Sequence, residues 1–207
     1  MEQIGTRDPR ADFLAVYSNT IKRDGAASML YWLDSHGFFE TPASTNKHLA
    51  QPGGLVIHSL NVYKRLLEIT ARDVFGGTDG ALLAEDVVET VAILGLLHDV
   101  CKAGVYHQET KRRKNPDTGK WEDYLGYTFW DPFPLGHGEK SLYLITRHMA
   151  LTEEEAMAIR WHMGAYDDAV KGGSRSMTEA MNLSPWVWRM QEADMCAAWI
   201  DERSAAE

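Results

Sequence analysis

The chain has 207 residues, of which 44% are hydrophobic, so it can bury one substantial core, and we expect one domain over residues 1–207. Its net charge of -9 argues against sequence-independent binding to bulk nucleic acid, because that binding needs Lys and Arg to neutralise phosphates. The two cysteines, Cys101 and Cys196, fall in different expected helices without metal-ligand spacing. They argue against a disulfide scaffold and fit a reducing cytoplasm.

The N-terminal segment, residues 1–8, is polar and mixed in charge, which predicts that it is not a signal peptide. No uninterrupted apolar stretch of the sequence reaches the roughly 18 residues that a membrane span needs. We therefore expect a cytoplasmic protein that does not enter a membrane.

Most of the chain is predicted to be helical. Helices are expected at residues 11–20, 26–35, 55–74 and 81–102, with a loop at residues 41–52. Thr152 and Glu155 form a capping-box pattern that opens a helix reaching His162. Ser184, followed by Pro185, is an N-cap signal for a last helix that extends to about residue 202.

Residues 105–130 break the helical pattern and predict a β-hairpin. The segment Asn115-Pro116-Asp117-Thr118-Gly119 is a turn signal, flanked by polar and aromatic residues with β tendency. One arm carries the cations Lys111-Arg112-Arg113-Lys114, and the other carries Trp121, Tyr124 and Tyr127. These side chains either form a flap that helps to hold a nucleotide or are a solvated charge run beside ordinary hairpin packing. We favour the second interpretation.

His98 and Asp99 follow an apolar run at residues 91–97, and Lys102 follows one turn later. A helix that is apolar nearly all round belongs in a core, where ionisable groups are seldom buried unless they are paired or bound to a metal. Residues three and four apart share a helix face, so all three side chains can address one pocket. The alternative is a helix that frays into solvent at its polar end.

Asp194 is a second carboxylate in apolar surroundings. It shares a face of the last predicted helix with Val187, Met190 and Ala197. A carboxylate in such a stripe is costly unless something neutralises it. Asp194 is therefore either a metal ligand or the partner of a buried cation, for which Arg189 is a candidate.

Further histidines lie on separate predicted helices: His58 in Gly53-Gly54-Leu55-Val56-Ile57-His58, His137 in Leu135-Gly136-His137-Gly138, and His162 in Trp161-His162-Met163. Together with His98-Asp99 and Asp194, this order resembles the HD-domain superfamily of metal-dependent phosphohydrolases. The resemblance extends over most of the chain, from about residue 48 to 200. It implies an all-α fold, an HD-domain helical bundle with a β-hairpin insertion near residues 105–130.

The resemblance also implies a ligand set. His58, His98, Asp99 and Asp194 would hold one metal, and His137 and His162 would hold a second, with Asp99 bridging the two. Imidazole and carboxylate suit divalent transition metals, so we expect one or two ions of Mn, Fe, Co, Ni or Zn per chain. Paired ions of this kind activate water and stabilise the oxygens of a phosphoryl displacement.

Asp99 and Lys102 are the expected catalytic residues, with Lys102 stabilising phosphate charge or protonating the leaving group. Lys102, Lys140 and His48 are the expected substrate contacts. The alternatives are a solvated helix start for Lys140 and an ordinary loop position for His48.

The expected activity is hydrolysis of a phosphate ester or phosphodiester in a nucleotide or short oligonucleotide, so the expected partner is a phosphorylated small molecule or short oligonucleotide. One alternative is an HD-fold diiron oxygenase that acts on a small organic substrate. Another is a non-catalytic nucleotide-binding regulatory protein that keeps the metal site. The sequence leaves the oligomeric state open.

Overall fold

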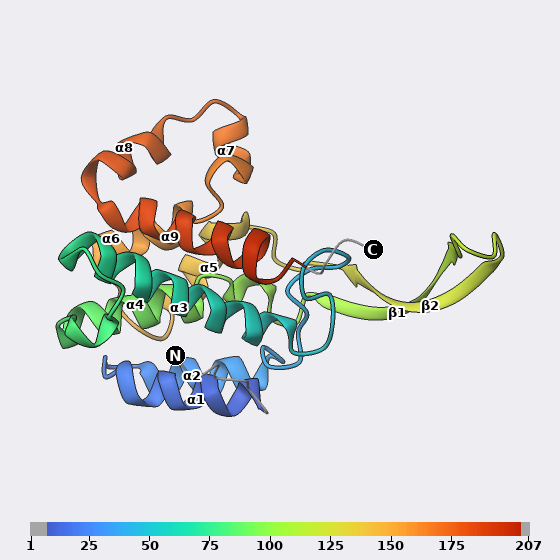
Figure 1. The fold of residues 1–207 in the computed structure, drawn as a ribbon, viewed down its shortest axis with the longest axis horizontal. Helices are drawn as coiled ribbons and strands as arrows, with labels where there is room; N and C mark the ends of the chain where they lie inside the picture. The colour runs from blue at the N-terminus through green and yellow to red at the C-terminus, as the bar shows by residue number, and fades with distance from the viewer. Residues whose placement is uncertain (1–7, 204–207) are drawn as a thin grey trace.

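The computed structural model describes residues 8–203, and helices make up most of this part of the chain (Figure 1). The helices are α1 (Pro9–Thr20), α2 (Ala26–Ser35), α3 (Gly54–Phe75), α4 (Glu85–Leu97), α5 (His137–Thr146), α6 (Glu153–Trp161), α7 (Asp168–Lys171), α8 (Ser176–Leu183) and α9 (Pro185–Cys196). A hairpin of β1 (Tyr106–Lys114) and β2 (Trp121–Phe129) lies between α4 and α5. The predicted all-α bundle with a hairpin insertion is confirmed.

Local signals set several helix ends as predicted. Gly76 ends α3 in the left-handed conformation, with φ 73°. Thr152 and Glu155 form both bonds of the capping box at the start of α6. The Ser184 side chain accepts the Trp186 backbone N–H at the start of α9.

Two predicted helices end differently. The helix expected at residues 81–102 is shorter: α4 begins at Glu85 and ends at Leu97, between the 3₁₀ turns Gly80–Leu82 and Val100–Lys102. Asp99 causes the break, because its φ of -106° and ψ of 17° leave the helical region. The last helix was expected to run unbroken to about residue 202, but α9 ends at Cys196 and continues as the π-helical turn Ala197–Asp201.

The helices pack around α3, which contacts α4 on one side and α9 on another; α6 contacts both α9 and α5 (Figure 1). Two glycines allow especially close helix contacts. A Cβ atom at Gly95 of α4 would lie 2.5 Å from Tyr63 Cα of α3, and one at Gly138 of α5 would lie 2.1 Å from the Arg160 carbonyl oxygen of α6. These contacts set the spacing between the helices that carry the predicted ligands.

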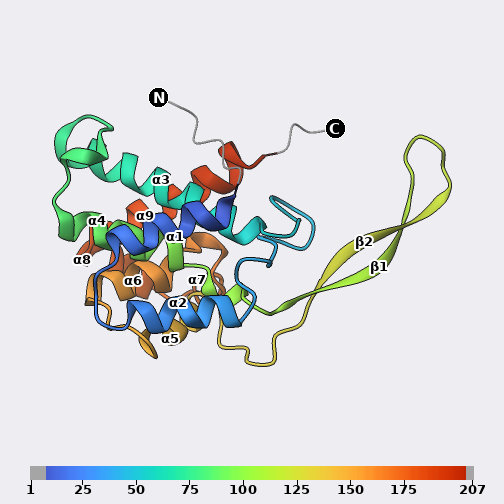
Figure 2. The ribbon, with the colours of Figure 1, turned by 90° about the horizontal axis from the view of Figure 1, so that it is seen from below.

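The hairpin projects away from the bundle (Figures 1 and 2). Its strands are antiparallel, with residues 106–114 paired to residues 121–129. Two cations near its tip are paired across the strands: Arg112 lies 3.2 Å from Asp123, and Arg113 lies 2.7 Å from Glu122. Projection and pairing both support the interpretation of a solvated charge run.

Among the residues that the structure describes, no helix combines the length and the apolar character that a bilayer crossing requires.

Candidate metal centre

All the predicted metal ligands converge inside the bundle. They come from α3 (His58), the turn after α4 (His98 and Asp99), the start of α5 (His137), the residue after α6 (His162) and α9 (Asp194). Around His58, the Nε2 atom lies 3.2 Å from Asp194 Oδ1, 3.3 Å from His98 Nε2 and 3.6 Å from Asp99 Oδ2. Metal–ligand distances of about 2.0–2.2 Å separate the ligands of one ion by about 3.0–3.6 Å, so these atoms are suitably spaced for a dication.

Asp99 connects this first group of ligand atoms to a second. Its Oδ2 atom lies 3.6 Å from the Nε2 atoms of His58 and His98. Its Oδ1 atom lies 2.6 Å from His137 Nε2 and 3.4 Å from His162 Nε2. The carboxylate thus presents one oxygen to each pair of histidines, which is the arrangement that a bridging ligand needs.

Helix ends orient two of the histidines. His98 and His162 each follow the last residue of a helix, where backbone carbonyls lack intrahelical partners. The Nδ1 atom of His98 lies 3.1 Å from the Gly95 carbonyl oxygen, and that of His162 lies 2.7 Å from the Ile159 carbonyl oxygen. A ring that donates its Nδ1–H to a carbonyl directs the lone pair of Nε2 into the cluster, as metal-binding histidines commonly do.

Glu202 performs the same task for His58, and sequence reasoning missed it. Its carboxylate accepts hydrogen bonds from His58 Nδ1 at 3.0 and 3.1 Å and from Asn61 Nδ2 at 3.0 Å. Such a carboxylate fixes the tautomer of a metal-binding histidine and strengthens it as a ligand. A glutamate near a helix end is too common to have signalled this role.

The chemistry of the cluster fits a divalent metal. His162 is 1% exposed, yet its Nε2 atom has no hydrogen-bond partner in the described part of the chain. A buried polar atom without a partner is costly, and a cation between His162 and Asp99 would satisfy it. Imidazole nitrogens and carboxylates are also the donor types that transition-metal dications accept.

The ionisation of the first group is uneven. Burial alone would lower the pKa of His58, but hydrogen bonds with Asp194 and Glu202 raise it to about 10. Burial lowers the pKa of His98 to about 3, although the negative charge of Asp99 acts in the opposite direction. At pH 7 the His98 ring is therefore neutral, whereas the His58 ring is protonated on both nitrogens and lies beside the carboxylate of Asp194.

In the second group, too, charged neighbours oppose the effect of burial on the pKa values. Burial alone would lower the pKa of His137, but Cys101 and Asp99 raise it to about 10. Burial alone would raise the pKa of Asp99, but Lys102, His98 and His137 hold it well below its usual value. Metal ligands must give up such protons, so metal binding at these histidines releases protons.

Lys102 contacts the cluster directly, with its Nζ atom 2.5 Å from Asp99 Oδ2. The contact forms in the 3₁₀ turn, where side chains three residues apart are eclipsed, and not on the continuous α-helix that the sequence predicted. Burial alone would lower the pKa of Lys102, but the charge of Asp99 raises it, which keeps the ammonium group protonated.

The other predicted contacts lie around the cluster. Lys140 is buried and its Nζ atom lies 2.5 Å from Asp131 Oδ1, so it is not a solvated helix start. His48 Nε2 lies 3.8 Å from Glu202 Oε2. Arg189, considered as a partner for Asp194, instead donates to Asp73 Oδ2 at 3.0 Å.

Two cavities border the cluster and share Lys102. The first, of about 320 Å³, is lined by Lys47, His48, His58, Asp99, Lys102, Met163, Tyr166, Lys171, Asp194, Met195, Ala198 and Trp199. The second, of about 280 Å³, is lined by Cys101, Lys102, Tyr106, Phe129, Asp131, Pro134, Gly136, His137, Lys140 and Asp168. Sequence reasoning missed the aromatic and additional cationic lining, because it is contributed by separate segments of the chain.

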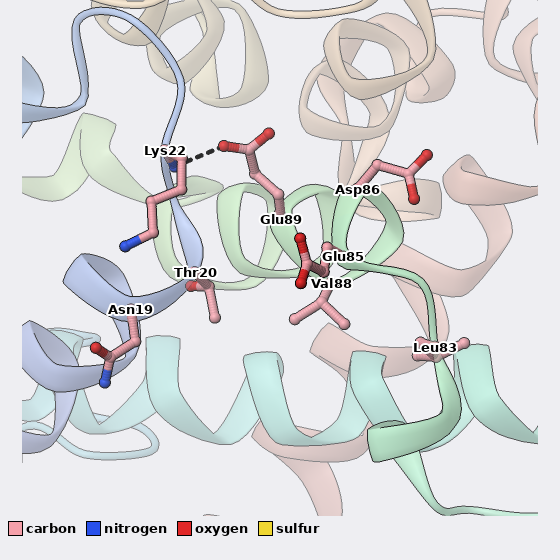
Figure 3. A pocket seen from close by; sticks show the side chains of 8 residues that line it. All are labelled: Asn19, Thr20, Lys22, Leu83, Glu85, Asp86, Val88 and Glu89. Atoms are coloured by element: carbon pink, nitrogen blue, oxygen red, sulfur yellow. Dashed lines mark hydrogen bonds between the residues drawn. The ribbon is translucent and has the colours of Figure 1, made fainter.

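A wider cavity of about 490 Å³ lies elsewhere, between α4 and the end of α1 (Figure 3). Its carboxylates include Glu89, which accepts the backbone N–H groups of Lys22 and Arg23 at 2.7 and 2.9 Å. These bonds give Glu89 a structural role, and the lining residues of this cavity are separate from the predicted ligands.

The structure is that of a helical protein with a buried histidine–aspartate cluster that could hold a metal ion. The sequence profile of the HD domain matches residues 55–199, and the chain belongs to this family. HD domains bind divalent metals and are mostly metal-dependent hydrolases. Searches of curated proteins and of solved structures gave no match to the chain.

Proposed function

We propose that the protein is a metal-dependent phosphohydrolase or phosphodiesterase that acts on a nucleotide or a short oligonucleotide. His58, His98, Asp99 and Asp194 would hold one dication, and His137 and His162 would hold a second with Asp99 between them. When bound, such ions supply an activated water and stabilise the charge that develops on phosphate oxygens.

The position of Lys102 is the main support for a phosphate substrate. Its ammonium group lies beside Asp99 and borders both cavities. A phosphate at the cluster would therefore meet a fixed positive charge beside the predicted ligands. Of the two roles considered for Lys102, this position favours stabilisation of the phosphate over protonation of the leaving group.

The two cavities suit a phosphate with a substituent on either side. The first combines Lys47 and Lys171 with the rings of Tyr166 and Trp199, which matches the anionic and aromatic parts of a nucleotide. In the second, Lys140 lies near Tyr106 and Phe129 at the base of the hairpin. We therefore place the base in the first cavity and the remainder of a diester in the second.

The test is hydrolysis by the full chain, stripped of metal and reloaded with Mn, Co, Ni, Fe(II) or Zn. The substrates are an aryl phosphodiester, nucleoside phosphates and dinucleotides. We expect metal-dependent hydrolysis that falls more than about 100-fold in Asp99→Asn, beyond the roughly 10–100-fold typical of a residue that only supports a ligand. Asp73→Asn, a matched change on the outer surface of α3, should retain full activity.

Two outcomes would overturn the proposal. Metal binding without hydrolysis of any phosphate would remove the phosphohydrolase assignment. Oxygen uptake that depends on an organic substrate and reduced iron would instead support the oxygenase alternative.

A further inference from the structure

Cys101 lies beside the second group of ligand atoms, although its spacing in the sequence gave no sign of this. It is 5% exposed and sits in the 3₁₀ turn between Asp99 and Lys102. Its Sγ atom lies 3.5 Å from His137 Nδ1 and 3.6 Å from His137 Nε2. Its backbone N–H donates to Ser141 Oγ at 3.2 Å, which fixes the turn against α5.

We propose that Cys101 is a thiolate ligand of the second metal site, together with Asp99, His137 and His162. The inference rests on the proposed metal centre and extends it. Asp99, Cys101 and His137 each offer one ligand atom, and these atoms all lie within 4.8 Å of one another. The cysteine thus adds a soft sulfur donor to a site otherwise built from nitrogen and oxygen.

The distances agree with a metal site. Ligand atoms around a tetrahedral zinc lie about 3.3–3.6 Å apart, given Zn–N and Zn–O distances of about 2.0–2.2 Å and a Zn–S distance of about 2.3 Å. Cys101 Sγ lies 3.6 Å from His137 Nε2, and His162 Nε2 lies 3.4 Å from Asp99 Oδ1. His137 Nε2 and Asp99 Oδ1 are closer, at 2.6 Å, because they form a hydrogen bond.

An independent observation points to a ligand at the same place. The Nε2 atom of His162 is buried without a hydrogen-bond partner and faces the Asp99 oxygen that contacts His137. Cys101 also lines the second cavity, so an ion can reach its sulfur from that side. A cation between these groups would satisfy the unpartnered nitrogen and bind the thiolate at once.

A thiolate changes which metals the second site accepts. Soft sulfur ligands favour zinc and similar transition metals, whereas magnesium and manganese prefer oxygen-rich sites. The second site should therefore bind zinc or cobalt in preference to manganese. Cys101→Ser should reduce the ratio of the zinc affinity to the manganese affinity, since a hydroxyl is a harder donor than a thiolate.

The test is titration of the metal-free full chain with Co(II) under anaerobic conditions, followed by absorption spectroscopy. We expect a near-ultraviolet thiolate-to-cobalt charge-transfer band in the wild type that is lost in Cys101→Ser. Cys196→Ser, which removes the other cysteine, should keep the band. In Cys101→Ser, the affinity for the second zinc should fall at least about tenfold. X-ray absorption of the zinc-loaded wild type should show a sulfur neighbour at about 2.3 Å from the metal. This measurement uses the wild type alone, so it does not require a variant to fold.

Cobalt binding by the wild type without a charge-transfer band or a sulfur neighbour would overturn the role of Cys101. Nucleotide hydrolysis in that same preparation would leave the proposed function intact. Failure of the wild type to bind any cobalt or zinc would overturn both the role of Cys101 and the metal-dependent function.

Discussion

Two clusters of charged side chains are buried in the same bundle, and their polar atoms are used differently. Glu155 is 0% exposed, and its carboxylate accepts hydrogen bonds from Arg23 at 2.5 and 3.0 Å, from Thr90 Oγ1 at 2.9 Å and from the Thr152 N–H at 2.8 Å. Around Asp99, by contrast, ring nitrogens converge on shared oxygens, and one nitrogen has no partner in the part of the chain that the structure describes.

The difference separates a structural cluster from one arranged for a ligand. A buried polar network whose members are all satisfied rigidifies a fold, whereas an unsatisfied buried atom calls for a partner such as an ion. Burial and charge alone would not distinguish the two clusters. We therefore expect metal binding to stabilise the chain through the Asp99 cluster. Substitutions that break the Glu155 ion pair should change stability without changing metal binding.

The largest expected effect is stabilisation by metal. A dication that binds only the folded chain should raise the free energy of unfolding by about 4 kcal/mol at one thousand times its Kd, because binding shifts the equilibrium by mass action. Calorimetry with and without zinc measures this. Asp99→Asn should lose most of the increase, and Glu155→Gln should keep it. Equal stabilisation of wild type and Asp99→Asn would contradict the assignment of the cluster.

The next largest effect is a loss of stability when the ion pair between Glu155 and Arg23 is broken. Glu155→Gln should lower the free energy of unfolding by about 2–3 kcal/mol, somewhat less than the roughly 3–5 kcal/mol for breaking a wholly buried pair, because Arg23 is partly exposed. Urea unfolding measures the loss, and metal affinity should stay unchanged. A fall in metal affinity of the folded variant would show that the two clusters are coupled.

The pH dependence of that loss separates charge from packing. Burial alone would raise the pKa of Glu155, but hydrogen bonds from Arg23 and Thr152 lower it below its usual value. The ionised group therefore adds stability above the unfolded-state pKa of about 4.3, and this stability is lost as pH falls through the lower folded-state pKa. The difference in free energy of unfolding between wild type and Glu155→Gln should be largest at neutral pH and should decrease below about pH 4. A gap that persists in acid would indicate a packing effect.

A supporting carboxylate should have a smaller influence on metal binding than a ligand. Glu202→Ala removes the acceptor for His58 Nδ1 and should weaken metal affinity by about 10–100-fold. Glu202→Gln retains an acceptor without the charge, so its affinity should lie between those of wild type and Glu202→Ala. Competition with a chelator measures all three. An unchanged affinity in Glu202→Ala would mean that the orientation of His58 does not depend on Glu202.

Sequence reasoning reached the features that depend on neighbouring residues. The capping box at Thr152, the N-cap at Ser184 and the turn of the hairpin each need only a few consecutive residues, and each was predicted correctly. The resemblance to a family supplied the ligand set, and the structure brings these side chains together.

Features that depend on packing between distant segments were not predictable. Glu202 meets His58 across 144 residues, and Arg23 meets Glu155 across 132 residues. Nothing local to either residue identifies its partner, because the contacts exist only once distant helices and turns have packed together. The break at Asp99 was missed for a related reason: the apolar run continues the helical pattern, while the backbone turns to place the carboxylate between two pairs of histidines.

The smallest effect is expected at the hairpin, which extends the comparison to charges on the surface. Arg112 and Asp123 form an exposed pair, and many such pairs contribute nothing measurable to stability. Arg112→Ala should therefore leave the melting temperature and the KM for a nucleotide unchanged, and Asp123→Ala, which frees the cation, is its matched control. A KM that rises in Arg112→Ala but not in Asp123→Ala would support the flap interpretation, because only then would the cation itself contact the substrate. Without such a rise, the pairing of Arg112 with Asp123 is sufficient to explain the presence of this cation, because an exposed ion pair needs no ligand.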